Sequence, residues 1–119
     1  MLNLDTHVLI HALEGTLKPS ERQLLGSNPW SISAIVLWEL AKLVQLKRLV
    51  VDLDSPDFRR VFARVHIWPI DLATAWQSTQ LDFRSDPADE IIAATSIVRG
   101  VPLLTRDRAI RRSKLVPLA

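Results

Sequence analysis

The sequence predicts an α/β fold in which helices cover both faces of a central, mostly parallel sheet. Short apolar runs of strand length alternate along the chain with longer segments that begin at capping residues and end at glycine or proline. Strands that alternate with helices are typical of parallel sheets, because a parallel connection needs a crossover that is usually a helix. The chain has 119 residues, the size of one domain, so we expect residues 1–119 to form a single domain.

The first half of the chain is predicted to contain strands at its short apolar runs and helices between caps and breakers. Gly15 should end the first helix, and the turn-forming segment 26–29 should end the second. Ser33 is a suitable N-cap for the helix that follows it. The predicted elements are the strand Leu2–Leu4, the helices Thr6–Glu14 and Pro19–Leu25, the strand Trp30–Ser33 and the helix Ala34–Leu46.

The second half continues the same alternation. Ser55 and Asp71 are suitable N-caps, Pro87 suits the first position of a helix, and Gly100 should end that helix. The predicted elements are a helix from Ser55-Pro56 to about Val65, the strand His66–Ile70, a helix from Asp71 to about Phe83, the helix Asp86–Arg99, the strand Val101–Thr105, a helical turn over Arg108–Arg112 and a last strand over Leu115–Leu118.

Composition excludes several classes of protein. Without cysteine, the chain can form neither a disulfide framework nor a zinc–thiolate site, and it has no thiolate nucleophile. No apolar run approaches the roughly 18 residues needed to cross a membrane, and the N-terminus lacks the features of a signal peptide. We therefore expect a cytoplasmic protein without membrane contacts. The formal charge of +2 does not by itself indicate nucleic acid binding.

Two aspartates follow predicted strands and should lie at one edge of the sheet. Asp5 comes directly after Leu2–Leu4, and Asp107 follows Val101–Leu104, with Thr105 between them. The carboxyl ends of parallel strands are where ligand sites form. Carboxylates crowded there repel each other unless a cation lies between them, and Mg²⁺ or Mn²⁺ with oxygen ligands is the common solution. Singly, each aspartate is explained as a turn residue; together they suggest metal-dependent chemistry on phosphate.

Glu39 is a further candidate because it interrupts the apolar stripe of a predicted helix. On a helical wheel it lies among Ile35, Val36 and Leu43. A carboxylate there costs desolvation free energy unless something compensates it, and a metal ion would do so. The alternative is a carboxylate at the rim that reaches solvent.

The acidic segment Asp86–Glu90 has two interpretations. Asp at the N-cap, Pro at the first helical position and acids in the first turn come close to a capping box and complement the helix dipole. Capping alone accounts for all of its acids. Asp89, however, shares a helix face with the small residues Ala93 and Ser96, which allow another element to approach closely. Local signals favour the capping interpretation, and Asp89 is the likelier of the two aspartates to bind a metal.

Basic residues, tryptophans and histidines give weaker signals. Tryptophans are more often core or interface residues than platforms for bases, and Trp38 lies on the more polar side of its helix, where an interface is expected. His7 and His11 have the spacing of a zinc helix but lack its glutamate. A basic group surrounds Asp107, where contacts to RNA phosphates are plausible. The candidates for those contacts are Arg106, Arg108, Arg111 and Arg112.

Four blocks of the sequence resemble the PIN domain family, and specifically the VapC-type toxins of bacterial toxin–antitoxin pairs. The resemblance runs over essentially the whole length. Each block is weak alone, but all of them in order, at suitable spacing in a chain this short, are specific. The blocks are Leu4–His7, Ser33–Leu40, Asp86–Asp89 running into Ile92–Thr95, and Leu104–Asp107.

This resemblance implies a three-layer α/β/α fold and a Mg²⁺- or Mn²⁺-dependent endoribonuclease that cleaves cellular RNA, often transfer RNA or ribosomal RNA. Similar members form homodimers and are inhibited by a cognate antitoxin whose tail enters the active-site groove. Carried over by position, the metal-binding and catalytic acids are Asp5, Glu39, Asp89 and Asp107, supported by Asp86, Thr105 and Thr6.

Two positions depart from the pattern of the family. Val36 stands where many relatives have serine, and Glu90 stands where arginine commonly follows the aspartate. The first change removes a hydroxyl one helical turn before Glu39, and the second reverses a charge beside the site. They motivate an alternative hypothesis: a catalytically idle PIN-like domain that acts as a protein- or RNA-binding partner.

Overall fold

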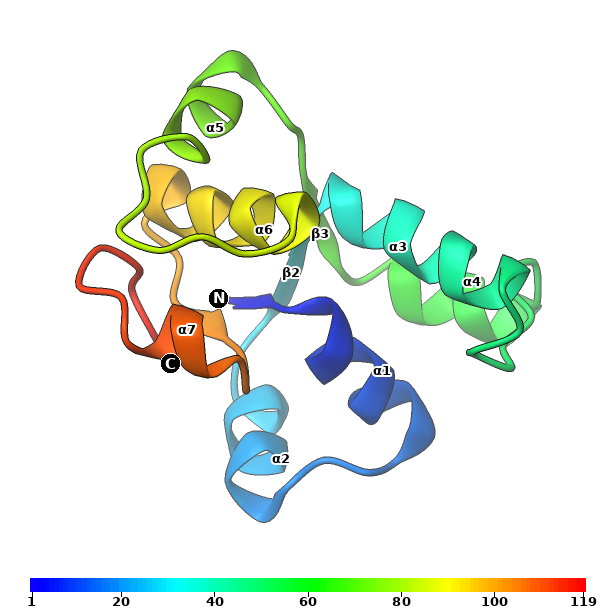
Figure 1. Cartoon of the computed structure of the whole chain (residues 1–119). Coiled ribbons are helices and arrows are strands. Elements are labelled where there is room, and N and C mark those ends of the chain that lie inside the picture. Colours follow the sequence, from blue (N-terminus) through cyan, green and yellow to red (C-terminus); the bar gives the residue numbers. More distant parts are fainter.

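The computed structural model describes residues 1–119 and contains one sheet of parallel strands (Figure 1). The strands are β1 (Leu2–Leu4), β2 (Trp30–Ser33), β3 (His66–Trp68) and β4 (Leu103–Leu104). They are arranged in the order β3-β2-β1-β4, and every pairing is parallel. The structure therefore confirms the predicted parallel α/β sheet.

Seven helices surround the sheet. They are α1 (Thr6–Glu14), α2 (Pro19–Gly26), α3 (Ala34–Gln45), α4 (Pro56–Phe62), α5 (Leu72–Gln77), α6 (Pro87–Arg99) and α7 (Arg108–Arg111). The chain adds β2 and β3 on one side of β1 and then returns to add β4 on the other side. Because such crossovers are right-handed, the reversal places α5 and α6 on the face opposite α1 and α2. Figure 1 shows these pairs above and below the strands, which gives three layers.

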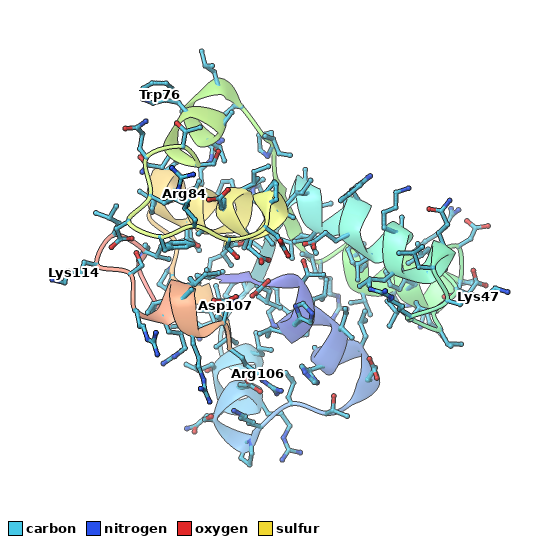
Figure 2. All side chains as sticks on the ribbon, in the orientation of Figure 1. Lys47, Trp76, Arg84, Arg106, Asp107 and Lys114 are labelled. Carbon is cyan, nitrogen blue, oxygen red and sulfur yellow. The ribbon has the colours of Figure 1, made fainter.

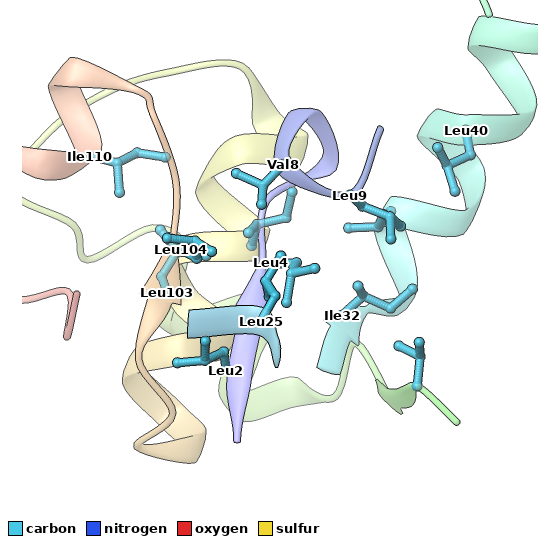
Figure 3. Close-up of a cluster of buried hydrophobic side chains, with 14 of the residues drawn as sticks. Leu2, Leu4, Val8, Leu9, Leu25, Ile32, Leu40, Leu103, Leu104 and Ile110 are labelled. Atoms are coloured by element: carbon cyan, nitrogen blue, oxygen red, sulfur yellow. The ribbon is translucent and has the colours of Figure 1, made fainter. Parts of the chain in front are cut away.

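A single hydrophobic core joins the layers (Figure 3). Leu4 of β1, Ile32 of β2 and Val8 of α1 are fully buried in it. A buried polar contact fixes α6 against the central strand, because Asn3 Nδ2 donates to the Ser96 hydroxyl (2.9 Å) and to the Ile92 carbonyl (3.3 Å). The close approach expected along the Ala93–Ser96 face is therefore made by β1.

The helix predicted to run to about Phe83 is shorter, since α5 ends at Gln77. The hydroxyls of Ser78 and Thr79 donate to carbonyls in the last turn of α5, over 2.6 and 2.7 Å. These bonds satisfy groups that a continuing helix would have used, and they compete with helix extension. Residues 78–86 instead form a loop that leads into α6.

Four other predicted elements are also shorter. The strand predicted over Val101–Thr105 is reduced to Leu103–Leu104 of β4, which begins after Pro102, a residue without an N–H for the ladder. The last strand is reduced to one parallel bridge between Leu103 and Leu118, next to Pro117, which has no N–H for a longer ladder. β3 ends before Pro69 for the same reason, and the helix predicted to reach Val65 ends at Phe62. None of the helices has both the length and the apolar character needed to cross a membrane.

Candidate active site

The fold brings the predicted acids to the carboxyl edge of the sheet. Asp5 and Asp107 follow the neighbouring strands β1 and β4. Glu39 lies on α3, which begins where β2 ends, and Asp89 lies in the first turn of α6. Burial raises the pKa of Glu39, and the charges of Asp89 and Asp5 raise it further. The acids are therefore close enough to repel each other.

Asp5 is the most deeply buried of these carboxylates. Its side chain is held by Thr105, whose hydroxyl donates to Oδ2 over 2.6 Å. The residue is 4% exposed, and its Oδ1 is buried with no hydrogen-bond partner. Although Asp5 occupies the N-cap position of α1, its side chain makes no capping bond. A turn or cap function therefore does not explain this aspartate, and its free buried oxygen fits a ligand.

Glu39 is half-buried and anchored to α1. The Thr6 hydroxyl donates to Glu39 Oε1 over 2.5 Å, and Thr6 is itself 1% exposed. This bond lowers the pKa of Glu39, but desolvation outweighs it and the net shift is upward. The exposed His7 also lowers this pKa through its charge. Thr6 therefore contacts Glu39 directly, and its role in the site stays a prediction.

Helix capping accounts for only one of the three remaining aspartates, which are Asp86, Asp89 and Asp107. Asp86 stands at the N-cap of α6, but its side chain makes no capping bond. Asp89 accepts from the Ser85 hydroxyl (3.0 Å) instead. Burial raises the pKa of Asp89, and the charges of Asp5, Asp107 and Asp86 add to that shift. Asp107 does cap α7, since its Oδ1 accepts from the backbone N–H of Ile110 (3.0 Å), and only its second oxygen takes no part in the cap.

Two residues near the acids were missed by the sequence interpretation. Ser85 falls between predicted helices, where a serine is expected in any loop, and nothing local indicates its bond to Asp89. His7 is exposed on α1, and its charge is close enough to lower the pKa of Glu39. A contact between β1–α1 and α3 cannot be inferred from local sequence signals.

A divalent cation fits the chemistry of this edge. All candidate ligands are carboxylate oxygens, which Mg²⁺ and Mn²⁺ prefer, and the unpartnered Asp5 Oδ1 lies among them. As the side chains lie, no three of them converge within ligand distance of one ion. Three observations support a cation here: the ligands available are carboxylates, Asp5 Oδ1 has no hydrogen-bond partner, and the carboxylates repel each other. A complete coordination shell is not among these observations.

The basic residues near Asp107 do not all face the same environment. Arg106 turns toward α2, where its Nε donates to Glu21 Oε2 (2.8 Å) and a terminal nitrogen donates to Oε1 (2.6 Å) (Figure 2). This ion pair engages the guanidinium and weakens the case for a phosphate contact by Arg106. Arg108, Arg111 and Arg112 are exposed beside Asp107.

Comparison with known proteins identifies the family. A family model described as the PIN domain matches residues 3–114. The chain belongs to the PIN domain family. No curated protein sequence matches this PIN domain significantly.

Solved structures share the fold of this PIN domain at low sequence identity. A toxin–antitoxin complex from Klebsiella pneumoniae has 21% identity and a TM-score of 0.71, covering 94% of this chain and 92% of that one. VapBC2 from Rickettsia felis, bound to a promoter DNA fragment, has 20% identity and a TM-score of 0.74, covering 100% and 98%. FitAcB from Neisseria gonorrhoeae has 23% identity and a TM-score of 0.67, covering 92% and 90%. These likenesses establish the fold.

The repulsion at Asp89 leads to a stability prediction for this PIN domain. Without metal, Asp89→Asn is expected to melt several degrees higher than the wild type, because the substitution removes a half-buried charge that faces other carboxylates. Thermal melts by circular dichroism in EDTA measure this effect. Adding Mg²⁺ should raise the melting temperature of the wild type more than that of the variant. A variant that melts lower in EDTA would show that the Ser85 bond outweighs the repulsion.

Proposed function

We propose that this PIN domain is the toxin component of a type II toxin–antitoxin pair and a Mg²⁺- or Mn²⁺-dependent endoribonuclease. The observation that carries the proposal is the set Asp5, Glu39, Asp89 and Asp107 at the carboxyl edge of the sheet, with a buried oxygen of Asp5 free for a ligand. The family supports nuclease chemistry, and the structural neighbours VapBC2 and FitAcB support the toxin assignment.

The acids, the threonines and the arginines would have different roles in this reaction. Asp5, Glu39 and Asp89 would hold the cation, with Asp107 completing the site. A divalent cation there supplies Lewis-acid catalysis, activating water and neutralising charge on the scissile phosphate. Thr105 and Thr6 hold Asp5 and Glu39 in place through the bonds described above, and the exposed Arg108, Arg111 and Arg112 are positioned to attract the RNA backbone.

An antitoxin and a second copy of the chain are the proposed protein partners, and the cytoplasm is the proposed site of action. Large apolar side chains remain exposed on α3, which carries Glu39, and on α5. Trp38 on α3 is 56% exposed and Trp76 on α5 is 67% exposed. Exposed aromatic residues of this size are typical of protein interfaces, which supports assembly with partners.

RNA cleavage by the purified chain tests the proposal. Incubation of total RNA with Mg²⁺ or Mn²⁺ should give discrete fragments with 5′-phosphate and 3′-hydroxyl ends, and EDTA should prevent their formation. Sequencing of the fragment ends would identify the target. If the metal raises the melting temperature but no RNA is cut, the idle binding-partner hypothesis is favoured instead. Cleavage that persists in EDTA would contradict the metal-dependent mechanism.

A further inference from the structure

A second pocket adjoins the acidic site. It has a volume of about 400 Å³ and lies between the loop 78–86 and the first turns of α6. Ser85 links the two sites, because it lines the pocket and also donates to Asp89 (3.0 Å). Glu90, the residue after Asp89, lines the pocket as well. A group held there would therefore lie next to a phosphate bound through the cation that the acids would hold.

Two opposite charges line this pocket without pairing. Glu90 is half-buried and Arg84 is exposed, and both side chains belong to the lining. None of the ion pairs of the chain involves either residue. Figure 2 shows Arg84 over α6. A ligand that complements both residues must carry an anionic group and, separately, hydrogen-bond donors.

The remaining lining suits a planar ring. Phe83 and Leu81 contribute apolar surface, and Ser78 and Thr79 contribute hydroxyl oxygens. An unstacked base of single-stranded RNA is recognised by stacking and by hydrogen bonds to its Watson–Crick edge. Of the four bases, only guanine presents two adjacent N–H donors on that edge, and a carboxylate accepts from both at once.

We propose that this pocket binds a guanine of the RNA strand next to the cleaved phosphodiester. Glu90 accepts from the guanine edge, and Arg84 contacts a neighbouring phosphate. The inference rests on the proposed function, and it assigns a specificity role to the acid at the position where relatives commonly carry arginine.

Binding without catalysis tests this subsite. Fluorescence anisotropy in EDTA compares two labelled hexanucleotides, one of uridines only and one with a single central guanosine. The wild type should bind the guanosine-containing RNA at least about fivefold more tightly. Glu90→Gln should abolish this preference. Arg84→Gln should weaken binding of both RNAs equally and reduce the salt dependence of binding.

A matched control is Glu14→Gln, which changes an exposed carboxylate on α1 outside the pocket and should keep the preference. Equal binding of both RNAs by the wild type, or a preference that survives in Glu90→Gln, would overturn the proposal. The binding assay does not depend on cleavage. If the protein prefers the guanosine-containing RNA but cuts no RNA, the nuclease assignment is contradicted and the guanine subsite is still supported.

Discussion

Asp5→Asn is expected to lose at least about a hundredfold in the rate of RNA cleavage while it keeps the fold. Asparagine can still accept the Thr105 bond that now goes to Oδ2 (2.6 Å). The substitution removes the negative charge that a hard cation requires. The Oδ1 atom of Asp5, which would bind this cation, is buried without a hydrogen-bond partner. Loss of an outer-shell partner of a metal commonly costs about 10–100-fold in affinity or activity, so loss of a direct ligand should cost at least as much.

Initial rates on one defined RNA, measured over a series of Mg²⁺ concentrations, give this effect. Asp57→Asn is the matched control, because the Asp57 side chain on α4 is 91% exposed and should not influence the rate. Circular dichroism melts establish that both variants are folded. A folded Asp5→Asn protein that cleaves at the rate of the wild type would remove Asp5 from the site.

The positions of the acids along the fold could be predicted because they depend on local signals. Apolar runs mark Leu2–Leu4 and Val101–Leu104 as buried strands, and the alternation with helices makes those strands parallel. Asp5 and Asp107 must then share an edge. The same local signals failed at the end of α5, where the Ser78 and Thr79 hydroxyls bond to carbonyls of the preceding turn. That choice between helix and loop is made by single hydrogen bonds.

The function of each charged residue was harder to predict, because it depends on partners far away in the sequence. Capping explained Asp86 and Asp89 equally well from sequence, yet Asp86 makes no cap bond and Asp89 binds Ser85. Arg106 belongs to a basic group in which every member is a phosphate candidate. Its pairing with Glu21, 85 residues away, comes from tertiary packing that brings α2 to the segment after β4, and nothing in the neighbouring sequence indicates it.

Glu21→Gln is expected to lower the free energy of unfolding at neutral pH by about 3 kcal/mol. Glu21 is 6% exposed and accepts two bonds from the Arg106 guanidinium and one from the backbone N–H of Lys18. The Arg106 bonds hold the pKa of Glu21 at about 2, below its ordinary value of 4.5. A gap of roughly 2.5 units at about 1.36 kcal/mol per unit gives that free energy. Urea unfolding at pH 7 measures it.

The pH dependence separates this ion pair from a loss of packing. Because the pKa of Glu21 is lower in the folded protein than in the unfolded chain, its contribution is complete above pH 4.5 and is lost as the pH falls toward 2. The difference in stability between the wild type and Glu21→Gln should therefore shrink over that range. A difference that stays constant would mean that glutamine disturbs packing alone. Arg106 directly precedes Asp107, so weakening the pair also frees the segment that carries this acid, and Glu21→Gln should slow cleavage even where the variant is fully folded.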